Sequence, residues 1–75
     1  MPAAAKTNLL LVDDHAIVRQ GLAALLAREE DFAVAGEAGT YEDGLAALAA
    51  FAPDAVVLDL SLRDRSGLDW IRAAR

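Results

Sequence analysis

Two apolar runs in this sequence end on acidic residues. Residues 8–12 are followed by Asp13 and Asp14, and residues 55–58 are followed by Asp59. A continuous apolar run that is too short for a helical period is typical of a parallel strand buried on both faces. In open parallel sheets, ligands bind beyond the carboxyl ends of the strands, where the strand order reverses. These three carboxylates are therefore the first candidates for chemistry.

The three carboxylates converge if the strands that precede them are neighbours. Two carboxylates about 4 Å apart repel each other by roughly 4 kcal/mol at an effective dielectric constant of 20. A single acid at the end of a strand can serve as the N-cap of the next helix, but capping does not account for three acids at one edge. A divalent cation relieves their repulsion, and ligands that are all oxygen favour Mg²⁺ over zinc.

Strand and helix patterns alternate along the chain. The expected elements are a strand at 8–12, a helix from Asp14, a strand at 32–36, a helix opened by Thr40 and stopped by Pro53, a strand at 55–58 and a helix opened by Ser66. This β-α-β-α-β-α order with short connections implies right-handed crossovers and a parallel sheet. The sequence therefore predicts part of an open α/β sheet.

Each expected helix has apolar residues at helical spacing, which should face the sheet. These residues are Ile17, Val18, Gly21, Leu22, Leu25 and Leu26 in the first helix, Leu45, Leu48, Ala49 and Ala52 in the second, and Leu68, Ile71 and Ala74 in the third. Capping residues are expected at each start: Asp13 or Asp14, then Thr40 with Asp43, then Ser66 with Asp69. Tyr41 and Trp70 are expected to be packing or surface residues.

Length and composition indicate one small globular domain. The chain has 75 residues, of which 56% are hydrophobic and 25% charged, and this balance excludes a disordered tail. A net charge of −5 disfavours nucleic acid and anionic membranes as direct partners. There is no cysteine, and the apolar runs are too short to span a bilayer. Residues 1–7 are expected to be a disordered leader rather than a signal peptide, so we expect a cytoplasmic location.

Two segments of the chain resemble the receiver domains of bacterial two-component response regulators. The first is the sequence LLLVDDH at 9–15 with VRQGL at 18–22, and the second is PDAVVLDL at 53–60 with Gly67 and Leu68 after it. The spacing of these residues is most similar to the subgroup that has a LuxR-type helix-turn-helix output domain. The resemblance extends over residues 8–75, which we therefore expect to be the N-terminal part of a receiver domain.

The resemblance implies a flavodoxin-like, doubly wound parallel sheet with strand order 2-1-3, in which strands 4 and 5 of the family are absent. It implies that Asp59 accepts a phosphoryl group from a sensor histidine kinase. It also implies that Asp13, Asp14, Asp59 and the backbone carbonyl of Ser61 bind Mg²⁺. Such a domain is a phosphoacceptor switch rather than an enzyme. Because the family's acceptor is an aspartate, His15 is expected to be an ordinary residue of the first helical turn.

The resemblance also implies partners and missing parts. The family places a Ser or Thr at the end of strand four and a Lys at the end of strand five, and the sequence stops before either position. We therefore expect a longer protein, with a C-terminal domain that binds DNA, a homodimer, and no contact with a membrane. The third strand would otherwise be an exposed apolar edge.

Three other functions were weighed against this one. A cobalamin-binding module uses Asp-x-His-x-x-Gly after its first strand, but Val18 stands where that motif requires glycine. An aspartate-nucleophile phosphatase needs an Asp-x-Asp spacing, whereas Asp13 and Asp14 are adjacent. The remaining alternative is a pseudo-receiver that acts as a protein interaction module without phosphorylation.

Overall fold

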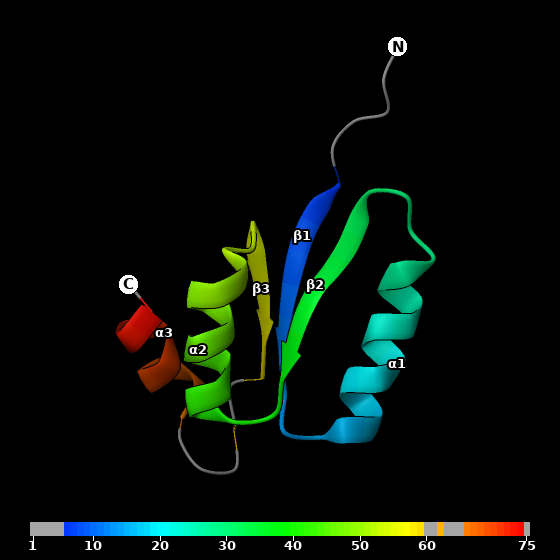
Figure 1. Ribbon diagram of the computed structural model, residues 1–75. Helices are drawn as coiled ribbons and strands as arrows, with labels where there is room; N and C mark the ends of the chain where they lie inside the picture. Colours follow the sequence, from blue (N-terminus) through cyan, green and yellow to red (C-terminus); the bar gives the residue numbers. More distant parts are fainter. Residues whose placement is uncertain (1–5, 60–61, 63–65, 75) are drawn as a thin grey trace.

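The computed structural model describes residues 6–59, 62 and 66–74 of the chain. Its elements are β1 (Thr7–Val12), α1 (Ala16–Ala27), β2 (Phe32–Ala38), α2 (Tyr41–Phe51), β3 (Ala55–Leu58) and α3 (Gly67–Ala74). The three strands are parallel and follow the order β2-β1-β3, with α1 on one side of the sheet and α2 and α3 on the other (Figure 1). The predicted element order and strand order are both confirmed.

The strand boundaries differ slightly from those expected. β1 begins at Thr7, so the last residue of the expected leader belongs to the sheet. β2 continues to Ala38, two residues beyond the expected strand. A shift in register between Leu9 and Leu10 accommodates an irregularity in β2, after which Val12 pairs with Ala38. β1 and β2 therefore run side by side up to the edge where Asp13 begins.

The capping predictions hold for α2 and α3 but not for α1. The Thr40 hydroxyl accepts a hydrogen bond from the Asp43 amide at 3.1 Å, and the Ser66 hydroxyl accepts one from the Leu68 amide at 3.1 Å. The N-cap of α1 is His15, without a side-chain capping bond. Asp13 lies too far before the helix to cap it. Its carboxylate instead accepts a hydrogen bond from the His15 amide at 2.8 Å, which closes a local turn.

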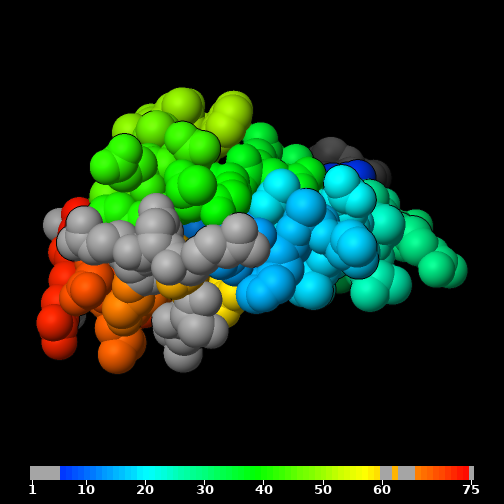
Figure 2. All heavy atoms as spheres, turned by 90° about the horizontal axis from the view of Figure 1, so that it is seen from below, coloured from blue at the N-terminus to red at the C-terminus, as the bar shows by residue number. Residues whose placement is uncertain are grey.

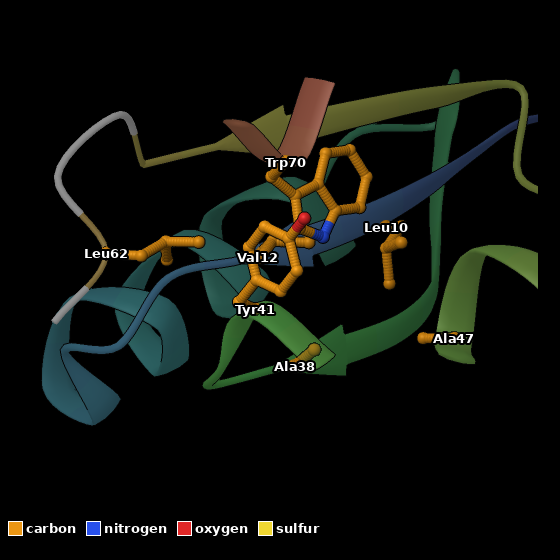
Figure 3. Close-up of a cluster of buried hydrophobic side chains, with 7 residues drawn as sticks. All are labelled: Leu10, Val12, Ala38, Tyr41, Ala47, Leu62 and Trp70. Atoms are coloured by element: carbon orange, nitrogen blue, oxygen red, sulfur yellow. The ribbon is translucent and has the colours of Figure 1, made fainter. Parts of the chain in front are cut away.

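The core lies between the central strand and the helices α2 and α3. Leu9, Leu10, Leu11 and Val12 of β1 are all buried, as expected for a strand covered on both faces. Leu10 and Val12 belong to the main cluster, in which the rings of Tyr41 and Trp70 lie close together beside Val12 (Figure 3). The expectation that Tyr41 and Trp70 serve packing is confirmed.

The buried faces of α2 and α3 match the prediction in part, because Leu45, Leu48 and Ala74 pack against the main cluster as expected. The buried residues of α2 are Tyr41, Gly44 and Ala47, whereas Ala49 and Ala52 are exposed. In α3, Gly67 and Trp70 are buried while Leu68 and Ile71 are exposed. The Trp70 indole lies against α2: a Cβ added to Gly44 would lie 2.6 Å from Nε1 of Trp70, so the large ring occupies the space that a side chain would need.

The other expected apolar faces are more open than predicted. α1 has no buried residue, and its Ile17 and Leu25 side chains are well exposed. Residues of β3 alternate between exposed and half-buried, because Val56 and Leu58 face the main cluster whereas Ala55 and Val57 point to the opposite, less covered face of the sheet. The prediction of a third strand buried on both faces is therefore wrong for this chain. Within residues 6–59, 62 and 66–74, none of the helices has the length and apolarity needed to cross a membrane.

Candidate functional site

The backbone of the sheet brings Asp13 and Asp59 to the same edge. Val12 and Leu58 are paired residues of the neighbouring strands β1 and β3, and each is followed directly by one of the two acids. The Asp59 amide donates to the carbonyl of Val12 at 2.9 Å, and the Asp13 amide donates to the carbonyl of Ala38 at 3.0 Å. The view of the molecule from below shows α1 at one end and α2 and α3 at the other (Figure 2).

The three predicted carboxylates converge. One oxygen each of Asp13, Asp14 and Asp59, together with a ring nitrogen of His15, lie within 4.8 Å of one another. The carboxylate side chains are largely shielded from solvent, with exposed fractions of 13% for Asp13, 8% for Asp14 and 19% for Asp59. Ser61, whose carbonyl was predicted as a further ligand, lies outside the described residues. We call Asp13, Asp14 and Asp59 the acidic triad.

His15 lies against all three members of the acidic triad, which the sequence analysis did not predict. Its Nδ1 atom is 3.1 Å from Oδ1 of Asp13, 3.0 Å from Oδ1 of Asp14 and 3.4 Å from Oδ2 of Asp59. The imidazole itself is 60% exposed, so the ring covers the acidic triad from the solvent side. Because His15 follows Asp14 in the sequence, a position near the acidic triad could have been expected. The direction of the ring, however, depends on a turn that the sequence does not reveal.

These contacts raise the pKa of His15 above its ordinary value of 6.5. The hydrogen bond to Asp13 has the largest effect, followed by the negative charge of Asp14, while desolvation of the ring acts in the opposite direction and is outweighed. The charges of Asp13 and Asp59 raise the pKa further. The protonated ring is thus a cation held by the acidic triad, and it reduces the repulsion among the three carboxylates.

Proteins of known family resemble this chain in sequence and in fold. The family model of the response regulator receiver domain matches residues 9–75. The chain belongs to this family. A solved LuxR-family response regulator from Aurantimonas sp. SI85-9A1 superimposes on it with a TM-score of 0.88 and 35% identity, covering 95% of this chain and 51% of that one. The flavodoxin-like fold predicted from the sequence is thereby confirmed for the three strands within the described residues.

Curated relatives are longer than this chain. The DNA-binding transcriptional activator DevR/DosR of Mycobacterium tuberculosis is 42% identical over 65 residues, which are 87% of this chain and 30% of the relative. A protein-glutamate methylesterase/protein-glutamine glutaminase of Cereibacter sphaeroides is 41% identical over 68 residues, or 91% of this chain and 19% of the relative. This chain therefore spans less than a third of either relative's length.

Arg19 is a further residue of this receiver's site that the sequence analysis missed. Its Nη1 atom donates to the backbone carbonyl of Asp13 at 2.6 Å, and its Nε atom lies 3.3 Å from a carboxylate oxygen of Glu37. The guanidinium thereby connects the first turns of α1 to the ends of β1 and β2. It fixes the backbone from which Asp13 and Asp14 project, and it adds a positive charge behind the acidic triad.

The acidic triad has the donor chemistry that Mg²⁺ requires. Mg²⁺ binds oxygen ligands, usually one or two carboxylates together with water, and carboxylates from two strand ends supply them here. The shielded position of the three side chains also makes their charges costly to leave without a cation. The receiver's site is therefore compatible with a magnesium ion.

Proposed function

We propose that this receiver domain accepts a phosphoryl group on Asp59 in a Mg²⁺-dependent reaction. The observation that supports the proposal most strongly is the convergence of Asp13, Asp14 and Asp59 at the carboxyl ends of β1 and β3. An isolated acid would not need two further carboxylates beside it, and their mutual repulsion has no structural benefit for the fold. The arrangement is suited to phosphoryl transfer, in which several negative charges come together and a cation neutralises them.

The side chain of Asp59 can act as the nucleophile without a general base, because an ionised carboxylate has no proton to lose. One of its oxygens attacks the phosphorus of a phosphohistidine on the donor kinase. The P–N bond breaks, its electron pair goes to the imidazole nitrogen of the donor, and an acyl phosphate forms on Asp59. The receiver has to provide alignment and charge neutralisation, since no other chemistry is needed.

Asp13, Asp14, Asp59 and the backbone carbonyl of Ser61 are the proposed Mg²⁺ ligands. When bound, the ion lowers the repulsion between the Asp59 carboxylate and the incoming phosphoryl oxygens. Arg19 maintains the position of the Asp13 backbone through its 2.6 Å hydrogen bond. The acyl phosphate then carries a charge of about −1.5 to −2 at neutral pH in place of the single negative charge of the carboxylate, and this change can shift the conformation of neighbouring surfaces.

The proposed partners follow from the family and its relatives. The phosphoryl donor is a sensor histidine kinase, and the protein acts in the cytoplasm. The output is a C-terminal helix-turn-helix domain that binds DNA, as a homodimer, because the solved structure is of the LuxR family and DevR/DosR is a DNA-binding activator. The receiver is thus a switch for transcription, and it has no catalytic activity beyond its own phosphorylation.

Intact-mass measurement tests the proposed function. The full-length gene product is incubated with acetyl phosphate, with Mg²⁺ or with a chelator, and we expect one phosphoryl adduct that requires Mg²⁺. Asp59→Asn should abolish the adduct, whereas Asp31→Asn, which changes an exposed aspartate far from the acidic triad, should keep it. If no adduct forms and Mg²⁺ does not bind either, the phosphoacceptor function is wrong and the pseudo-receiver alternative replaces it.

A further inference from the structure

The imidazole of His15 is a metal-binding group that the proposed function leaves unused. Its Nδ1 atom contacts one oxygen of every member of the acidic triad, at 3.1, 3.0 and 3.4 Å. It is also the one histidine of the sequence. A nitrogen donor that faces three carboxylates from the solvent side changes which ions the site can hold.

We propose that His15 sets the metal selectivity of this site, because Nδ1 supplies a fourth ligand to Zn²⁺, which then competes with Mg²⁺. The inference rests on the proposed function in one respect: it takes the acidic triad to be the ligand set for a divalent cation. It goes beyond that function by naming a second ion, and by assigning a role to a residue that phosphorylation itself does not use.

The spacing of the four donor atoms supports a tetrahedral ion. In a tetrahedral zinc site with ligands at about 2.0–2.1 Å from the metal, neighbouring ligand atoms are about 3.3–3.4 Å apart. The three distances from Nδ1 of His15 to the carboxylate oxygens are 3.0–3.4 Å. All four donor atoms lie within 4.8 Å of one another, so only a modest closing of the oxygens completes the tetrahedron. One imidazole and three carboxylates thus supply all four ligands.

The chemistry of the nitrogen favours Zn²⁺ over Mg²⁺. Imidazole is a good ligand for zinc, whereas Mg²⁺ is a hard ion that binds oxygen and keeps several waters. A Mg²⁺ ion on the acidic triad needs room for those waters on the solvent side, which is where the His15 ring lies. The ring is 60% exposed and can rotate away, but its hydrogen bond to Asp13 is lost when it does. His15 therefore strengthens Zn²⁺ binding and weakens Mg²⁺ binding.

The direct test uses Zn²⁺ and Mg²⁺ separately on the full-length product labelled with ¹⁵N-histidine. The imidazole nitrogens of His15 are identified as the pair of resonances that is missing from the spectrum of His15→Ala. We expect Zn²⁺ to move the Nδ1 resonance to the chemical shift of a metal-bound nitrogen. Mg²⁺ should leave the resonance at the chemical shift of an imidazole without a metal. Calorimetry should show that His15→Ala weakens Zn²⁺ binding by at least about tenfold, the lower end of the cost of removing even an outer partner of a ligand. The same substitution should tighten Mg²⁺ binding, because it removes the ring from the space that the waters of the ion need.

Two controls separate this inference from the proposed function. Gln20→Ala changes an exposed residue of α1 away from the acidic triad and should alter neither affinity. Asp59→Asn should weaken both ions, because both use its carboxylate. If Zn²⁺ binds equally to the parent chain and to His15→Ala, or leaves Nδ1 unshifted, the role of His15 is wrong. The Mg²⁺ titration of the same samples then decides whether the proposed function stands without it.

Discussion

The Nδ1 atom of His15 lies 3.4 Å from Oδ2 of Asp59, although one residue precedes α1 and the other follows β3. The parallel pairing of β1 with β3 produces this proximity, since Val12 and Leu58 end their strands at the same level. The two side chains come from the two loops at the carboxyl edge of the sheet. A change in the protonation of His15 should therefore directly change the electrostatic potential at the Asp59 carboxylate.

The first prediction concerns the titration of His15 in the metal-free chain. Its pKa should lie above 6.5, because the hydrogen bond to Asp13 and the charge of Asp14 favour the protonated ring. Asp14→Asn should lower that pKa by removing a neighbouring negative charge. Titration of the imidazole ring by NMR in the presence of a chelator measures both values. A folded-state pKa at or below 6.5 would contradict the observed contacts.

The same shift predicts the sign of a pH effect on stability. A pKa that is higher in the folded than in the unfolded state means that folding favours the bound proton, so the contribution is fully present below about pH 6.5. It is lost as the pH rises through the folded-state pKa. Urea midpoints of the parent chain and of His15→Gln should therefore differ more at acidic than at alkaline pH. The difference should be small, because the ring is exposed.

The second prediction compares two glycines within helices. Gly44→Ala would place its Cβ 2.6 Å from Nε1 of Trp70 and 3.0 Å from Cγ1 of Val12, so it should destabilise the fold by about 1–3 kcal/mol through overpacking. Gly21→Ala meets nothing within 4 Å and should be stabilising by up to about 1 kcal/mol, because alanine is the better helix former. Urea denaturation measures both. Equal effects at the two positions would show that Trp70 does not pack on α2 as described.

The third prediction concerns Arg19. Arg19→Met removes the 2.6 Å hydrogen bond to the Asp13 carbonyl and the ion pair with Glu37, and it should cost about 1.5–3 kcal/mol of unfolding free energy. It should also weaken Mg²⁺ binding, since the backbone of Asp13 loses its anchor. Arg28→Met is the matched control, because Arg28 is exposed at the end of α1. If Arg19→Met and Arg28→Met behave alike in both assays, Arg19 does not position the acidic triad.

The fourth prediction tests the N-cap of α2. Thr40→Ala removes the hydroxyl that accepts from the Asp43 amide, and it should destabilise the chain by about 1 kcal/mol. Thr40→Ser keeps the hydroxyl and should retain most of the stability. Urea midpoints of the three proteins give the comparison. A Thr40→Ser chain as unstable as Thr40→Ala would mean that the capping bond is not what Thr40 contributes.

Much of this fold was predictable because its signals are local. The apolar run of β1 and the capping residues Thr40 and Ser66 indicate their own structure without help from distant parts of the chain. The acids after β1 and β3 were also predictable as a cluster, because parallel strands end at the same edge. Asp13, Asp14 and Asp59 were therefore found from the sequence and brought together by the structure.

What the sequence could not predict depends on tertiary contacts. The burial of Gly44 against the Trp70 indole is a contact between separate helices, which helical periodicity alone does not contain. The exposure of Val57 in β3 depends on what packs against its face of the sheet, and an apolar strand pattern does not reveal which face is covered. The position of the His15 ring depends on the turn closed by Asp13 and on the packing of α1. Arg19 belongs to the segment VRQGL, but the role of its side chain was missed because the sequence does not show which backbone carbonyl a helical arginine contacts.

The central claim is that Asp59 is the residue that becomes phosphorylated, and chemical mapping of the adduct tests it most directly. The full-length product is phosphorylated with acetyl phosphate and Mg²⁺, the acyl phosphate is reduced with borohydride to homoserine, and peptide mass spectrometry locates the changed residue. We predict homoserine at position 59 and unchanged aspartate at positions 13 and 14. Homoserine at position 13 or 14, or at an aspartate outside the acidic triad, would contradict the account.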